Sequence, residues 1–183
     1  DLTIMQTTAI LESAYKLKCE KIKCFPEIMV PLVGSIEEFV NQKKIINTVG
    51  AEINKKYNTT IKYAVGTMIE LPRACVIANK IAEHADFISF GTNDLTQTAF
   101  GFSRDDIGSF LPEYIRYNIL KNDPFSTLDT EGVGQLIKLG VERARKTNPS
   151  IKIGICGEHG GDSKSIEFFH SMNFNYVSCS PFR

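Results

Sequence analysis

The sequence predicts an α/β fold in which parallel strands alternate with helices within one domain. Short apolar runs, bounded by Pro, Gly or polar residues, alternate with longer stretches whose apolar residues recur at helical spacing. The apolar runs are nearly continuous, which is typical of parallel strands covered by helices. The length of 183 residues fits a single domain, so we expect residues 1–183 to form one unit.

Five segments are expected to form the strands of this sheet: 27–33, 63–70, 87–90, 151–156 and 176–180. Helical spacing predicts helices at 3–20, 72–84, 131–146 and 163–172, with a longer mixed stretch at 95–128. A further helix is expected to begin at Ser35-Ile36-Glu37-Glu38, which has the pattern of a capping box. In that helix we expect these side chains to face inward: Phe39, Val40, Ile46, Val49 and Ile53.

The number of strands is small for a closed barrel. A (β/α)8 barrel of the TIM type usually takes about 250 residues, so five strands would form only the later part of one. Either the fold is a small open sheet, or the first strands of a barrel lie upstream in a longer chain. The chain begins with Asp1 rather than Met, which favours a piece of a longer protein.

Composition excludes several classes of protein. Lys+Arg and Asp+Glu both number 21, so the net charge gives no reason to expect nucleic acid or an anionic membrane surface as a partner. No apolar run approaches the ~18 residues of a membrane span, and the N-terminus lacks the features of a signal peptide. Five cysteines without a C-x-x-C motif disfavour zinc clusters and a disulfide framework. A reducing, cytoplasmic location is therefore expected.

Polar or reactive residues follow the expected strands. They are Glu70, the run Gly91–Asp94, the run Cys156–Glu158, and Ser180 with Pro181. In parallel α/β folds, ligands bind at the carboxyl ends of the strands, and all these ends lie on one edge. We therefore expect these residues to form a site.

Glu70 and Asp94 are candidate metal ligands. Two carboxylates with open coordination positions beside them suit Mg²⁺ or Mn²⁺. Each residue alone has an ordinary explanation, since Glu can be a solvated residue after a strand and Asp94 follows Asn93 in a pattern common in turns. Their expected position on one edge favours the metal site.

The run Gly91-Thr92-Asn93 is a candidate anion site. Its backbone N–H groups, hydroxyl and amide could bind a phosphoryl group or a carboxylate, and Gly91 would permit close approach. The alternative is a plain exit from strand to turn, which the spacing alone favours slightly. Neither of the common glycine-rich phosphate-binding motifs occurs in the sequence.

Cys156 is a candidate nucleophile or proton donor, because flanking glycines would expose its thiol on a mobile loop. The alternative is a small buried residue, and we interpret the other cysteines in that way: Cys19, Cys24, Cys75 and Cys179. His84, His159 and His170 are interpreted as structural, and His159 is the one closest in sequence to Cys156.

Three longer motifs carry a family resemblance: G-T-M-I-E-L-P-R-A at 66–74, S-F-G-T-N-D-L-T-Q at 89–97 and G-I-C-G-E-H-G-G at 154–161. They resemble the phosphoenolpyruvate-utilising enzymes over nearly the whole chain. The resemblance implies the later half of a (β/α)8 barrel that binds phosphoenolpyruvate (PEP) and pyruvate. Further motifs, F-G-F-S-R-D-D at 100–106 among them, fit the member that converts ATP, phosphate and pyruvate to AMP, diphosphate and PEP.

The resemblance also implies roles for individual residues. Mg²⁺ would be held by Glu70 and Asp94, and it would stabilise a pyruvate enolate. Substrate contacts would come from Glu70, Gly91, Thr92, Asn93 and Asp94. Cys156 would move the proton at the methyl carbon.

The resemblance further implies partners. A phosphohistidine on another domain of the same protein would carry the phosphoryl group, and the barrel would form a homodimer. The isolated 183 residues are expected not to turn over alone. Alternatives are a PEP synthase or a barrel of the phosphotransferase-system enzyme I type, and a non-catalytic dimerisation module.

Overall fold

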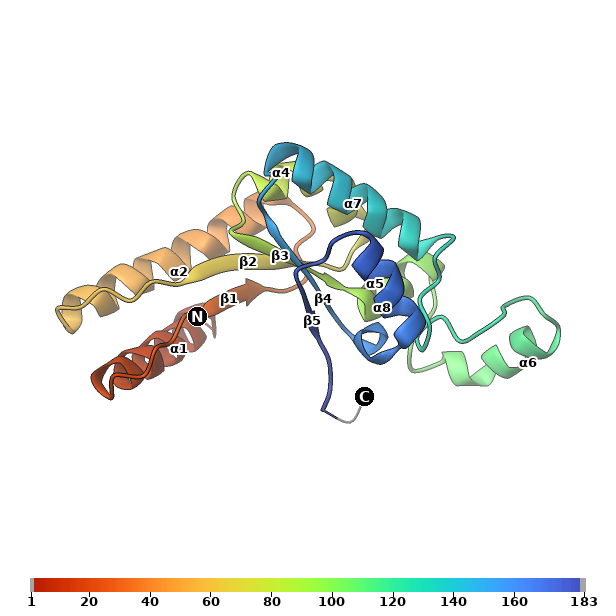
Figure 1. Ribbon diagram of the computed structural model, residues 1–183, viewed down its shortest axis with the longest axis horizontal. Helices are drawn as coiled ribbons and strands as arrows, with labels where there is room; N and C mark the ends of the chain where they lie inside the picture. Colours follow the sequence, from red (N-terminus) through yellow and green to blue (C-terminus); the bar gives the residue numbers. More distant parts are fainter. Residues whose placement is uncertain (1, 182–183) are drawn as a thin grey trace.

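The computed structural model describes residues 2–181 and contains one sheet of five parallel strands in the order β1-β2-β3-β4-β5 (Figure 1). The strands are β1 (Glu27–Val30), β2 (Ala64–Ile69), β3 (Phe87–Gly91), β4 (Lys152–Cys156) and β5 (Tyr176–Ser178). Among the described residues the sheet does not close, so β1 and β5 are its two edges. This is the expected α/β architecture, and it is consistent with part of a TIM-type barrel.

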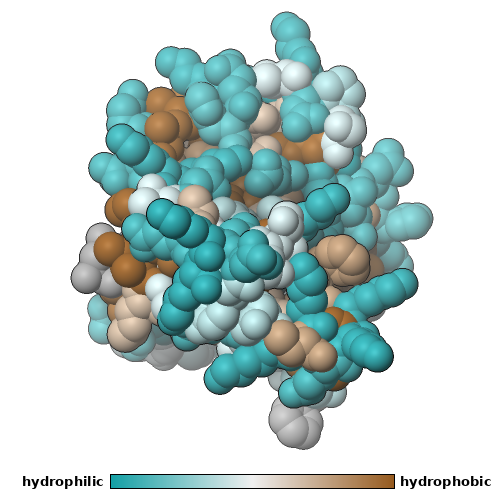
Figure 2. Space-filling view, turned by 90° about the vertical axis from the view of Figure 1, so that its left-hand side faces the viewer, coloured by the Kyte–Doolittle hydropathy of each residue, from teal (hydrophilic) through white to brown (hydrophobic). Residues whose placement is uncertain are grey.

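Helices connect successive strands, as the parallel order requires. The α-helices are α1 (Leu2–Cys19), α2 (Ile36–Lys56), α3 (Pro72–Val76), α4 (Ala78–Ala82), α5 (Thr92–Phe100), α6 (Leu111–Arg116), α7 (Val133–Thr147) and α8 (Ser163–Ser171). Two short 3₁₀ helices are η1 (Ile107–Ser109) and η2 (Glu158–Gly161). Figure 1 shows α1 and α2 side by side at one end of the molecule and α6 at the other. Seen from the α1–α2 end, the surface is mainly hydrophilic with separate hydrophobic areas (Figure 2).

The core lies where the central strand meets the helices. All five residues of β3 are buried, and Phe90 packs against Phe174 with ring centroids 5.6 Å apart. Gly140 of α7 allows this helix to approach closely, because a Cβ there would lie 3.1 Å from the Phe90 ring. Phe90 therefore fixes β3 against the helices. Ser89 and Gly91 alternate with Phe90 along β3, so they lie on the opposite face of the sheet.

The predicted capping box at the start of α2 is confirmed. The Ser35 hydroxyl accepts a hydrogen bond from the Glu38 amide, and the Glu38 carboxylate accepts from the Ser35 and Gly34 amides at 2.8 Å each. These two amides lower the pKa of Glu38. The cap fixes where α2 begins and so orients the whole 21-residue helix.

Several expectations about individual elements are wrong. The strand expected at 27–33 ends at Val30, and Met29 is 37% exposed because it lies on the opposite face of β1 from the buried Ile28. Val40 points outward and is 41% exposed. The helix expected at 72–84 is two short helices, since Ile77 leaves helical geometry between α3 and α4.

The cysteines also differ from expectation. Cys75 is buried as expected, but Cys19, Cys24 and Cys179 are exposed. Cys19 lies at the end of α1, Cys24 in the connection to β1, and Cys179 after the edge strand β5, and each is exposed there. Among the described residues, no helix combines the length and apolarity that crossing a membrane requires.

Candidate active site

The carboxyl ends of β2, β3 and β4 bring the predicted site residues together at the carboxyl-terminal end of the sheet. The strand register pairs Ile69 with Phe90 and Gly91 with Cys156. Glu70 follows β2 directly, Gly91 ends β3, and Cys156 ends β4. Ser180 and Pro181 were also expected in the site. They are exposed residues beyond the end of β5.

Glu70 is a nearly buried carboxyl group, with 3% of the residue exposed. Its Oε1 atom accepts a hydrogen bond of 2.6 Å from the Leu32 amide, and the Asp94 carboxylate lies close enough to interact with it electrostatically. Burial raises the pKa of Glu70, and the neighbouring Asp94 charge raises it further, against the opposing effect of the Leu32 amide. Within residues 2–181, no lysine or arginine forms an ion pair with either carboxylate. No positively charged side chain of the described residues therefore neutralises the Glu70–Asp94 pair.

The chemistry of this pair fits Mg²⁺. Across the described part of the chain, no group of three or more His, Cys, Asp or Glu residues is arranged to hold a metal ion. Mg²⁺ does not require such a group, because it is commonly bound by one or two carboxylates and completes its octahedral shell with water and substrate oxygens. A divalent cation would also offset the repulsion between Glu70 and Asp94.

Helix α5 begins directly after β3, where the sequence alone left a turn as the alternative. Thr92, Asn93 and Asp94 form its first turn, and the Gly91 N-cap makes no side-chain capping bond. The first N–H groups of a helix have no intrahelical partner, and the helix dipole places partial positive charge there. The mouth of the site can therefore hold a phosphoryl group or carboxylate by backbone N–H groups.

Gly91 is required by the packing around Glu70. A Cβ atom at Gly91 would lie 2.5 Å from Glu70 Oε2, 2.8 Å from Glu70 Cβ and 2.8 Å from Met68 Cε. The glycine thus lets strand β3 and Glu70 approach more closely than any side chain would permit.

Cys156 is a half-buried thiol whose sulfur has two neutral hydrogen-bond partners. The Ser89 hydroxyl donates to Sγ at 3.5 Å, and Sγ lies 3.7 Å from the Phe90 carbonyl oxygen, to which it can donate. Burial raises the pKa of Cys156, and the charges of Glu70 and Asp94 act in the same direction, against the opposing effect of the Ser89 hydrogen bond. The protonated thiol is therefore favoured at neutral pH, which suits a proton donor better than a thiolate nucleophile.

The segment after Cys156 contacts the first turn of α5, and its mobility stays a prediction. Asn93 Oδ1 accepts a hydrogen bond of 3.0 Å from the Glu158 amide, and Gly157 adopts φ 120°. A Cβ at Gly157 would lie 2.8 Å from Thr92 Oγ1. The first turn of α5 and the Cys156–Glu158 turn are thus packed directly together.

His159 is the residue whose position the sequence did not reveal. It is fully buried, and its ring nitrogens lie 2.7 Å from Thr92 Oγ1 and 2.8 Å from the Pro124 carbonyl oxygen. Ser89 was also missed as a neighbour of Cys156. Its alternation with Gly91 along β3 was the one signal that could have placed it on the site side of the sheet.

Comparisons with known proteins agree with these motifs. The family described as PEP-utilising enzyme, PEP-binding domain, matches residues 1–183. Pyruvate, phosphate dikinase 2 of Oryza sativa subsp. japonica is 53% identical over 183 residues, covering 100% of this chain and 21% of that protein. The chloroplastic pyruvate, phosphate dikinase 1 of Arabidopsis thaliana is 53% identical, covering 100% of this chain and 19% of that protein. The chain therefore spans about a fifth of the length of these relatives.

Proposed function

The chain belongs to the family of PEP-utilising enzymes, and from this we propose that it forms the PEP- and pyruvate-binding part of a pyruvate, phosphate dikinase. The full-length enzyme would be a transferase that converts ATP, phosphate and pyruvate to AMP, diphosphate and PEP. The observation that carries the proposal is that three groups lie together at the carboxyl-terminal end of the sheet. These are the Glu70–Asp94 pair, in which Glu70 is buried, the first turn of α5 and the half-buried Cys156 thiol.

Each group has a distinct task in this proposal. Glu70 and Asp94 would hold Mg²⁺, which would act as a Lewis acid towards the substrate oxygens. The backbone N–H groups of Thr92, Asn93 and Asp94 would bind the anionic end of the substrate. The Thr92 hydroxyl already contacts His159, so Thr92 would bind through its backbone. Because Asn93 Oδ1 accepts from Glu158, its amide nitrogen is left to donate to the substrate.

Cys156 would carry the proton at the methyl carbon of pyruvate. In the direction of pyruvate, the thiol would donate its proton to the terminal carbon of the enolate and become a thiolate. In the direction of PEP, the thiolate would take a proton from the methyl group, and the enolate oxygen would attack the phosphorus of a phosphohistidine. That histidine would belong to another domain of the same protein. The relatives are dikinases, so a PEP synthase or an enzyme I type barrel is the less favoured alternative.

Binding of oxalate, a planar mimic of the pyruvate enolate, tests this proposal. Calorimetry is expected to show oxalate binding in the presence of Mg²⁺ and no binding without it. Glu70→Gln and Asp94→Asn are each expected to weaken that binding by more than about tenfold, because each removes a charged oxygen ligand.

Asp105→Asn, which removes an exposed carboxylate from the connection between α5 and η1, serves as the control and should bind oxalate normally. Binding that does not depend on Mg²⁺, or that survives in both variants of the carboxylate pair, would overturn the proposed metal site.

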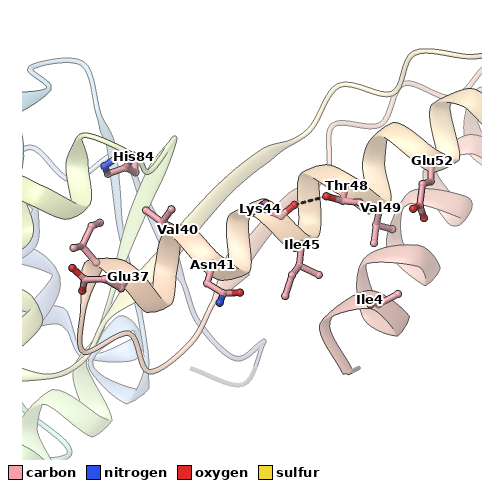
Figure 3. Close-up of a pocket in the computed structure, with 11 residues that line it drawn as sticks. Ile4, Glu37, Val40, Asn41, Lys44, Ile45, Thr48, Val49, Glu52 and His84 are labelled. Atoms are coloured by element: carbon pink, nitrogen blue, oxygen red, sulfur yellow. Dashed lines mark hydrogen bonds between the residues drawn. The ribbon is translucent and has the colours of Figure 1, made fainter.

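We further propose that the chain self-associates as a homodimer through α2. An apolar groove of about 820 Å³ runs along this helix and is lined by Ile36, Val40 and Ile45, with Ile4 of α1 at one end (Figure 3). Glu37 and Lys44 lie two helical turns apart on the same stripe. A two-fold axis between Val40 and Asn41 would place two such helices antiparallel. Ile36 would then face Ile45 of the partner subunit, and Glu37 would face Lys44 of the partner subunit, so apolar and opposite charges would match.

Charge reversal at this groove tests the homodimer. Glu37→Lys and Lys44→Glu are each expected to shift the mass in sedimentation equilibrium towards the monomer. In either variant, residues 37 and 44 of the two subunits carry the same charge, and the two-fold axis creates two such repulsive pairs. The double variant Glu37→Lys/Lys44→Glu should recover the mass of the unaltered chain. Equal masses for all four proteins would exclude this interface.

We also propose that the protein works in a reducing compartment of the cell. All five cysteines are unpaired, and three of them are exposed. Exposed thiols persist where glutathione and thioredoxin keep them reduced, so a reducing compartment such as the cytoplasm is proposed.

A further inference from the structure

His159 joins three segments of the chain that are distant in sequence. It lies in η2, just after the Cys156 turn, and it is fully buried. One ring nitrogen, Nδ1, contacts Thr92 Oγ1 in the first turn of α5 at 2.7 Å. The other, Nε2, contacts the Pro124 carbonyl oxygen in the connection before α7 at 2.8 Å. A buried imidazole with both nitrogens partnered fixes the relative position of all three segments.

The two partners determine the direction of the hydrogen bonds. A carbonyl oxygen can only accept, so Nε2 must carry the proton that is donated to Pro124. In the neutral ring Nδ1 then has a lone pair and can only accept, so the Thr92 hydroxyl donates to it. Burial lowers the pKa of His159, which favours this neutral ring, against the opposing effects of the Pro124 bond and the nearby Asp162, Asp123 and Glu158 carboxylates.

This direction has a consequence for Thr92. A hydroxyl has one proton, and at 2.7 Å that proton is used in the bond to His159. The longer contact from Thr92 Oγ1 to the Cys156 carbonyl oxygen, at 3.4 Å, is therefore secondary. His159 thus decides where the Thr92 side chain lies, and Thr92 in turn packs against Gly157, the residue after Cys156.

We propose that His159 is a positioning residue, whose bond to Thr92 holds the Cys156 turn against the first turn of α5. The bond would keep the thiol, the Asn93 amide and the two carboxylates in one arrangement. His159 itself would not touch the substrate. The proposal rests on the proposed function, because it concerns how the PEP- and pyruvate-binding site is kept in register.

Two amide substitutions separate the two hydrogen bonds of His159. In His159→Asn, the side-chain oxygen can take the place of Nδ1 and accept from Thr92, while the bond to Pro124 is lost. In His159→Gln, the longer side chain can place its amide nitrogen near the position of Nε2 and donate to Pro124, while the bond to Thr92 is lost. Both variants lose the imidazole ring, so both should lower the melting temperature.

The two variants are compared in the full-length protein that contains this chain. Three quantities are measured: the melting temperature, the affinity for oxalate with Mg²⁺, and the rate at which the methyl protons of pyruvate exchange with deuterated water. We expect His159→Gln to weaken affinity and slow exchange by about tenfold or more, the effect of one lost buried hydrogen bond. His159→Asn should stay within about threefold of the unaltered protein in both.

The outcomes are distinguishable. A larger loss in His159→Gln than in His159→Asn, at similar melting temperatures, supports the positioning role. Equal losses in both variants, or losses that only follow the melting temperature, mean that His159 merely fills the core, and the inference is overturned. If the unaltered full-length protein neither binds oxalate nor exchanges pyruvate protons, the proposed function itself fails, and the inference falls with it.

Discussion

Replacing Cys156 with alanine in the full-length protein is expected to slow exchange of the pyruvate methyl protons and formation of PEP by about 10²- to 10⁴-fold, the range for loss of a general acid or base. Cys156 ends β4, where its thiol lies near the Glu70–Asp94 pair and can carry a proton. Burial and the two carboxylate charges raise the pKa of its thiol, which favours the protonated form. Alanine removes the proton and leaves the carboxylates and the first turn of α5 in place.

The affinity for oxalate with Mg²⁺ should therefore stay nearly unchanged in Cys156→Ala, which separates proton transfer from ligand binding. Cys24→Ala, at an exposed cysteine before β1, is the matched control and should behave like the unaltered protein. Exchange at the normal rate in Cys156→Ala would remove this residue from the mechanism.

Gly91→Ala should damage the site through packing rather than through chemistry. The added methyl group would lie within 2.8 Å of Glu70 Cβ, an atom that cannot move without its backbone. Overpacking of this kind costs about 1–3 kcal/mol in the free energy of unfolding. Because the clash is relieved by moving Glu70, we also expect the affinity for oxalate with Mg²⁺ to fall by more than about tenfold, equivalent to about 1.4 kcal/mol.

Gly108→Ala provides the matched control for this change. No atom lies within 4 Å of a Cβ at that position, so its free energy of unfolding should not fall and its oxalate affinity should not change. Urea denaturation and calorimetry measure the two quantities. If Gly91→Ala were as stable as Gly108→Ala and bound oxalate equally well, close approach of Glu70 to β3 would not be needed.

The sequence by itself determined the features that depend on near neighbours in the chain. The apolar runs and helical periods gave the order of five strands and their helices, because each pattern repeats within a few residues. The capping box at Ser35 was readable for the same reason, since its two bonds join residues three apart. The motifs around Glu70, Asn93 and Cys156 also lie within single segments, so their family resemblance could be seen without a structure.

Only the tertiary structure decided the features that join distant segments. Met29 and Val40 are exposed because no other element fully covers the face on which each lies, and local hydrophobicity does not record which face of a strand or helix is covered. The Glu70–Asp94 contact depends on the register of β2 with β3 and on α5 starting at Thr92. The hydrogen bonds of His159 also depend on the tertiary structure, since Thr92 and Pro124 lie 67 and 35 residues away in the chain. Hydrogen bonds between buried groups are set by the packing of the whole fold, and no local pattern specifies which distant partner each group will meet.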